Sequence, residues 1–153
     1  PQSYIFEKCV ENYKYYPNIS VVKCCIGNYN GDTDLYVAGP LTTTSKKMVD
    51  EYKTLDWAKG LFMGDVYPIK SPIYTLDNML EKYNCPFNFD VLVIDTEGTE
   101  LDVLKGFSID KWKPKMMIIE LHEIDVIEVN KLMEKHNYKK IHEDSINTIF
   151  VLN

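Results

Sequence analysis

The stretch FDVLVIDTEGTELDVLKGF, residues 89–107, decides the fold class of this chain. Residues 91–94 are all apolar and Asp95 follows them directly, which predicts a buried strand that ends in a carboxylate. Gly98 permits a sharp turn after the strand, and residues 99–106 then have helical spacing and end in a glycine. Because strands buried on both faces are typical of parallel sheets covered by helices, the stretch predicts an α/β fold.

The rest of the chain continues this alternation. The pattern predicts a mostly parallel sheet in a single domain over 1–153, with a C-terminal antiparallel hairpin. Asn30-Gly31 is typical of a tight hairpin between two neighbouring strands. The expected strands cover 3–6, 19–27, 33–39, 91–95, 115–122 and two segments within 139–153, and the expected helices cover 7–17, 75–83, 99–106 and 123–138.

Residues 40–72 do not fit the alternation. They combine prolines and glycines with large apolar residues, among them Trp57 and Phe62, and are too apolar for a disordered linker. A loop of this length inside a domain is often a lid or a substrate-specificity insertion. A surface excursion that covers one sheet edge explains the composition equally well.

Composition restricts the class of partner and the compartment. The net charge is −6 and all 17 basic residues are lysines, which argues against nucleic acid as a partner. The four cysteines lack the spacing of a zinc site, so no metal is expected. No signal peptide and no apolar run of about 20 residues is visible. These features predict a domain without a membrane span in the reducing cytoplasm.

Several carboxylates are predicted to gather at one edge of the sheet. Ligands of open α/β sheets bind outside the carboxyl ends of the strands, and Glu7, Asp95 and the Glu120/His122 pair are expected at such ends. Glu7 and Asp95 should then lie side by side. Asp95 is best explained by function, whereas Glu97 fits a functional and a helix-start role equally well.

Four segments carry a family resemblance. YTLDNMLEKY at 74–83, the stretch at 89–107, PKMMIIELH at 114–122 and NTIFV at 147–151 resemble, in order and spacing, the FkbM family of S-adenosylmethionine-dependent methyltransferases. YIFE at 4–7 and VVKCCIGNYNGDTDLYV at 21–37 are similar to the family's second strand and to its third strand with a hairpin. The resemblance covers almost the whole chain and implies a Rossmann-like sheet.

The resemblance also implies roles for single residues. Glu7 would hold the ribose hydroxyls of S-adenosylmethionine, Cys25 and Ile26 would lie against the adenine, and Asp95 would sit near the sulfonium. The reaction would transfer a methyl group to a hydroxyl of a sugar or other small molecule. Asp95 and His122 are candidates for the base or its orienting group, and Glu97 is a third catalytic candidate.

The family's first strand and glycine-rich turn have no match, so an N-terminally truncated domain is expected. Three explanations stay open: a fragment of a longer enzyme, a reduced fold, or a strand supplied by another copy, which would give a homodimer through an unpaired strand edge. Two other functions also stay open. One is an inactive interaction module derived from a methyltransferase. The other is a metal-dependent exonuclease, because Asp95 and Glu97 form an Asp-x-Glu motif.

Overall fold

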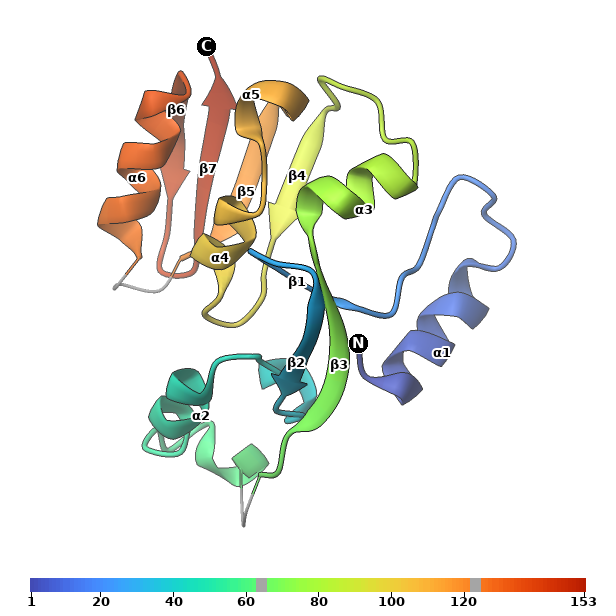
Figure 1. Cartoon of the computed structure of the whole chain (residues 1–153). Helices are drawn as coiled ribbons and strands as arrows, with labels where there is room; N and C mark the ends of the chain where they lie inside the picture. Colours follow the sequence, from blue (N-terminus) through green and yellow to red (C-terminus); the bar gives the residue numbers. More distant parts are fainter. Residues whose placement is uncertain (63–65, 122–124) are drawn as a thin grey trace.

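The computed structural model describes residues 1–62, 66–121 and 125–153, and it combines helices with two β-sheets (Figure 1). This arrangement confirms the α/β class predicted from the sequence. Within the described ranges, no helix is long and apolar enough to cross a membrane.

The larger sheet has the strand order β4-β5-β7-β6. β4 and β5 are parallel, with Ile94 opposite Ile119, whereas β7 runs antiparallel to both β5 and β6. The two apolar strands and the C-terminal hairpin are therefore confirmed. The sheet has more antiparallel pairs than the mostly parallel sheet that we expected, because the hairpin supplies half of its strands. The bounds are Val91–Ile94 for β4, Met116–Glu120 for β5, Tyr138–Glu143 for β6 and Asn147–Leu152 for β7.

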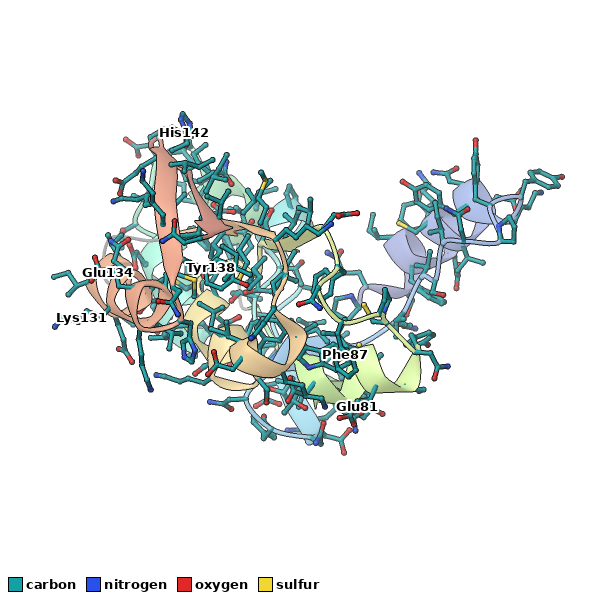
Figure 2. The ribbon with its side chains drawn as sticks, turned by 90° about the horizontal axis from the view of Figure 1, so that it is seen from above. Glu81, Phe87, Lys131, Glu134, Tyr138 and His142 are labelled. Carbon is teal, nitrogen blue, oxygen red and sulfur yellow. The ribbon has the colours of Figure 1, made fainter. Side chains whose placement is uncertain are left out.

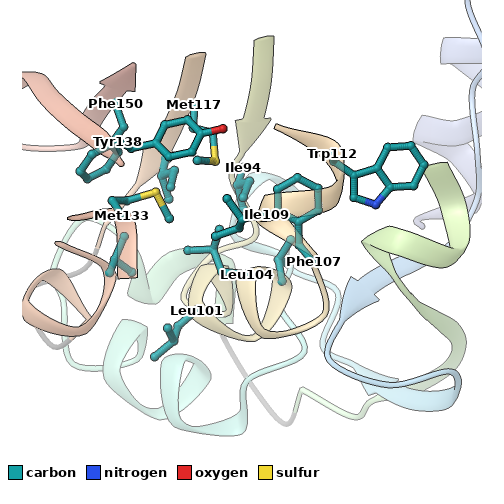
Figure 3. Packing of buried hydrophobic residues seen from close by; sticks show 13 residues of the cluster. Ile94, Leu101, Leu104, Phe107, Ile109, Trp112, Met117, Met133, Tyr138 and Phe150 are labelled. Carbon is teal, nitrogen blue, oxygen red and sulfur yellow. The ribbon is translucent and has the colours of Figure 1, made fainter. Parts of the chain in front are cut away.

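One face of this sheet holds the main core. Helices α4 (Glu100–Lys105), α5 (Ile109–Trp112) and α6 (Val126–Lys135) contribute side chains to a single buried cluster with β5 and β7 (Figure 3). Met117 and Phe150 lie opposite each other in this cluster and are fully buried. Each such side chain stabilises the fold by roughly 1.5–3 kcal/mol. The opposite face is partly exposed to solvent, since Val91 and Val93 of β4 are exposed and alternate residues of β5 and β7 are only half-buried.

The smaller sheet has the order β1-β3-β2, with bounds Cys25–Gly27, Ile69–Thr75 and Gly31–Leu35. The predicted pairing of neighbouring strands through an Asn30-Gly31 hairpin is wrong, because β1 and β2 each pair with β3 instead. The Asn30 side chain accepts a hydrogen bond from the Thr75 backbone N–H at 3.0 Å, so the turn is fixed to β3. The predicted strand at 19–27 is shortened to its last three residues.

The N-terminal segment forms helix α1 (Ser3–Tyr13), so the predicted strand at 3–6 is wrong. Ile5, Cys9 and Tyr13 recur at four-residue intervals, and this helical spacing outweighs the β-propensity of the first few residues. Glu7 consequently lies in the middle of an exposed helix and not at a strand end. The predicted side-by-side placement of Glu7 and Asp95 at two strand ends is therefore wrong. Figure 2 shows α1 standing apart from the helices of the core.

Residues 40–72 contain regular structure that the sequence did not predict. They include η1 (Gly39–Leu41, partly), α2 (Lys46–Tyr52), η2 (Lys59–Phe62) and the first part of β3. Ser45 caps α2 by accepting the Met48 N–H at 3.2 Å. Leu41, Val49 and Phe62 belong to a small buried cluster that is separate from the main core.

Helix α4 joins the two sheets. A Cβ at Gly106, the residue that ends α4, would lie 2.1 Å from the Gly27 carbonyl oxygen, so only glycine permits this approach to β1. The Asn28 side chain also donates to Asp102 of α4 at 3.0 Å. Helix α3 (Leu76–Lys82), which precedes α4, is capped by the Thr75 side chain, which accepts a hydrogen bond from the Asn78 N–H at 3.2 Å. The contacts of Gly106 and Asn28 hold β1 beside α4, the helix that follows the loop after β4.

Candidate functional site

The loop after β4 has an unusual backbone that one buried acid holds in place. Glu97 and Gly98 have φ values of +57° and +89°, in the left-handed region that favours glycine. Glu100 is 1% exposed and accepts hydrogen bonds from the backbone N–H groups of Thr96 and Gly98, at 2.8 and 3.1 Å. Thr99 makes no side-chain cap. Glu100 therefore has a structural role in this loop. Asp95 and Glu97 remain the candidates for a functional role.

Asp95, Glu97 and Glu120 form a cluster, hereafter the acid cluster, in which one oxygen of each carboxylate lies within 4.8 Å of the other two. The parallel register explains the proximity of two of them, since Asp95 and Glu120 follow the paired residues Ile94 and Ile119 at the same edge. Three carboxylate oxygens this close could accept a proton, attract an organic cation or bind a divalent cation.

Glu120 has the most perturbed acidity in the cluster. Burial, a hydrogen bond with Asp95, and the charges of Asp95, Glu97 and Glu100 raise the pKa of Glu120 to about 7. Like charges that share a site cannot all ionise, so the proton stays on one of them. Near neutral pH, Glu120 is therefore partly protonated, and its protonated carboxyl group donates a hydrogen bond to Asp95.

A tyrosine from another part of the chain completes the cluster. The hydroxyl of Tyr52, the last residue of α2, donates to Glu97 Oε2 at 2.5 Å. Burial, this hydrogen bond and the neighbouring carboxylates raise the pKa of Tyr52, so its phenol remains a donor. Thr43 is also buried and donates to the backbone carbonyl of Glu97 at 2.8 Å.

Two adjoining cavities open beside the acid cluster. The first has a volume of about 240 Å³ and is lined by Cys25, Ile26, Leu35 and Asp95, together with four threonines, namely Thr42, Thr44, Thr96 and Thr99. Burial raises the pKa of the Cys25 thiol, which keeps it neutral. An apolar wall combined with hydroxyls and one acid could hold a small molecule that has a flat ring and polar groups.

The second cavity has a volume of about 440 Å³ and lies between α1 and the loop after β4. Phe6 and Cys9 of α1 line it from one side, and Asp95 and Glu97 line it from the other. The two cavities share Asp95, Thr96, Thr42 and Pro1. Together they reach the size that small-molecule and cofactor sites usually have.

The structure thus brings together most of the residues that the sequence singled out. Asp95 and Glu97 share the acid cluster, and Cys25 and Ile26 line the first cavity with Asp95. Glu7 does not line either cavity, and His122 lies outside the described residues. Tyr52 was missed, since a contact across 45 residues leaves no local signal in one sequence.

A family model described as the methyltransferase FkbM domain matches residues 1–140 of the 153. No curated protein and no solved structure matches the chain. Because the match spans most of the sequence, including β4, β5 and the acid cluster, the chain belongs to the FkbM family of methyltransferases.

Proposed function

We propose that this chain is an S-adenosylmethionine-dependent O-methyltransferase that acts on a hydroxyl group of a small molecule or sugar. The observation that carries the proposal is that the acid cluster, in a chain of the FkbM methyltransferase family, borders two cavities that share Asp95 in their linings. A reaction of this kind needs a group that accepts the hydroxyl proton and a pocket that aligns two small molecules.

The first cavity would hold the cofactor. Ile26 and Cys25 offer an apolar surface for the adenine, the threonine hydroxyls offer hydrogen bonds, and Asp95 offers a negative charge to the sulfonium. When bound, S-adenosylmethionine supplies an electrophilic methyl group on a positively charged sulfur. For Glu7, a role at the ribose rests on the family resemblance alone, because its side chain is exposed on α1.

The acid cluster would accept the proton of the acceptor hydroxyl. The acceptor oxygen would form a bond to the methyl carbon while the sulfur–methyl bond breaks, and the neutral thioether S-adenosylhomocysteine would leave. The hydroxyl proton would pass to a carboxylate, so that bonds and charges balance. Asp95 lines both cavities and is the best-placed candidate for this base. Glu120 is hydrogen-bonded to Asp95 and would hold the exchangeable proton of the pair. Because Glu120 loses its proton near pH 7, activity should rise as the pH increases through about 7.

Residues 40–72 would contribute acceptor specificity. Thr43 and Tyr52 contact Glu97 directly, and Trp57 is 70% exposed beside Tyr52, with ring centroids 6.2 Å apart. An exposed indole in contact with Tyr52, whose hydroxyl reaches the acid cluster, is a suitable surface for a sugar ring. Trp57→Ala should raise the KM for such an acceptor several-fold and leave the affinity for S-adenosylmethionine unchanged.

The larger sheet supports two further parts of the proposal. The parallel pair β4–β5, with acids at its carboxyl end, supports a Rossmann-like arrangement. Among the described strands, β4 has no partner on its outer edge, and Val91 and Val93 are 48% and 63% exposed. A homodimer could form along this edge. Light scattering during size-exclusion chromatography tests it, and a monomer at all concentrations would refute the dimer.

The chemistry of the cysteines and the charge fit this function. The four cysteines are free, which suits a reducing compartment such as the cytoplasm. The net charge of −6 disfavours nucleic acid as the acceptor.

Methyl transfer is the direct test. Wild-type protein should transfer label from methyl-labelled S-adenosylmethionine to members of a panel of sugars and small alcohols, and Asp95→Asn should lose at least about 100-fold, the usual contribution of a general base. An inactive protein that still binds a protein partner would support the interaction-module alternative. Magnesium-dependent degradation of single-stranded DNA would support the exonuclease alternative.

A further inference from the structure

Thr43 and helix α2, which precede β3 in the sequence, contact the loop after β4 that carries Asp95 and Glu97. Thr43 donates to the Glu97 carbonyl at 2.8 Å, and Tyr52 donates to the Glu97 side chain at 2.5 Å. Met48 packs so closely on Gly98 that a Cβ there would lie 2.3 Å from Met48 Cγ. Helix α2 and the loop after β4, which are far apart in the sequence, thus meet at the acid cluster.

The Tyr52 ring is held on two sides. It stacks on Phe62 with ring centroids 5.7 Å apart and an interplanar angle of 23°, and it meets the edge of Trp57. Its side chain is 4% exposed, so little water competes for the hydroxyl. A donor on a fixed ring, aimed at one carboxylate oxygen, defines the orientation of that carboxylate.

We propose that Tyr52 is a positioning residue whose hydroxyl holds Glu97 as a hydrogen-bond acceptor and thereby leaves the exchangeable proton of the acid cluster to Asp95 and Glu120. The catalytic consequence rests on the proposed function, whereas the placement of the proton is a property of the protein without ligands. A carboxylate that accepts a strong hydrogen bond is stabilised in its charged form and binds a proton less readily.

Ionisable groups reach Glu97 from each neighbouring element in the described part of the chain. Asp95 comes from its own loop, Glu100 from α4, Glu120 from β5 and Tyr52 from α2. Backbone N–H groups occupy Glu100, and the Tyr52 hydroxyl occupies Glu97, which leaves Asp95 and Glu120 as the pair that shares a hydrogen bond.

A carboxyl titration by carbon-detected NMR tests the proposal on the protein without cofactor. Tyr52→Phe keeps the ring and removes the donor, so the titration midpoint of Glu97 should rise by about one pH unit, the size expected for a hydrogen bond to a charged group. Tyr83→Phe removes a phenol from the end of α3 and should move nothing. An unchanged Glu97 midpoint in Tyr52→Phe would overturn the proposal.

Two further variants separate positioning from packing. Thr43→Val removes a hydroxyl that donates to the Glu97 backbone carbonyl and accepts the Ser45 N–H, but no contact with the Glu97 carboxylate. It should therefore lower stability but leave the Glu97 midpoint in place. With Glu97 present, Tyr52→Phe should also shift the midpoint of Glu120, because Glu97 then competes for the shared proton. In a Glu97→Gln background, Tyr52→Phe should leave the Glu120 midpoint unchanged. The same shift in both backgrounds would mean that Tyr52 acts through packing, which contradicts the proposal. Failure to bind S-adenosylmethionine would leave these results intact, so the two hypotheses fail separately.

Discussion

Replacing Glu120 by glutamine should remove much of the pH dependence of this protein's stability between about pH 5 and 8. Burial and the surrounding carboxylates raise the pKa of Glu120 from the ordinary 4.5 to about 7. The folded state therefore binds this proton more tightly than the unfolded chain does. Its stabilising contribution is fully present below about pH 4.5 and is lost as the pH rises through about 7. Glutamine keeps a donor toward Asp95 and never ionises.

The size of the effect follows from the shift in pKa. At about 1.4 kcal/mol per pH unit, the shift corresponds to a ceiling of about 3 kcal/mol in the free energy of unfolding. Glu120 is half-buried, and water screens the interaction, which reduces the expected effect to about 1 kcal/mol. In a chain of this length, that difference moves the melting temperature by about 2–4 °C.

Thermal unfolding followed by circular dichroism at several pH values measures the effect. Wild type and Glu120→Gln should melt at similar temperatures near pH 5, and the variant should be the more stable one near pH 8. Glu134→Gln, an exposed replacement on α6, serves as the matched control and should follow the wild type at every pH. Parallel curves for wild type and Glu120→Gln would refute the claim that the cluster retains a proton near neutrality.

Three glycines give further predictions, each measured by urea denaturation. Gly98→Ala should cost about 2–4 kcal/mol, because alanine would adopt a φ of +89° and press on Met48. Gly106→Ala should cost about 1–3 kcal/mol, because its Cβ would strike the Gly27 carbonyl, and it should also weaken binding in the cavity lined by β1. Gly60→Ala is the control, with no atom within 4 Å of the new Cβ, and should change stability by less than about 0.5 kcal/mol.

Local patterns predicted the parts of the fold in which local and tertiary preferences agree. The apolar runs that became β4 and β5 and the C-terminal hairpin fall into this class. α1 was partly misjudged because three β-prone residues open a segment whose longer spacing is helical. β3 was missed because Pro72 argues against a central strand. The structure accommodates Pro72 because the pairing with β1 begins only at Ile73.

The residues of the candidate site also fall into two groups, those that local patterns predict and those whose positions depend on tertiary contacts. Asp95 and Glu120 could be predicted because each follows an apolar strand, and parallel strands place such residues at one edge. Glu7 was placed wrongly because its position depended on a strand that does not form. Tyr52 and Thr43 could not be predicted, since their contacts with Glu97 depend on how residues 40–62 fold back onto the loop after β4.

Calorimetric titration with S-adenosylmethionine tests the central claim that the cavities beside the acid cluster form a cofactor site. Wild type should bind with saturable heat, and Asp95→Lys should abolish binding by placing a cation beside the sulfonium. Asp90→Lys changes an exposed acid at the opposite end of β4 and should bind like the wild type. No heat from wild type at millimolar cofactor, or equal binding by Asp95→Lys, would contradict the account.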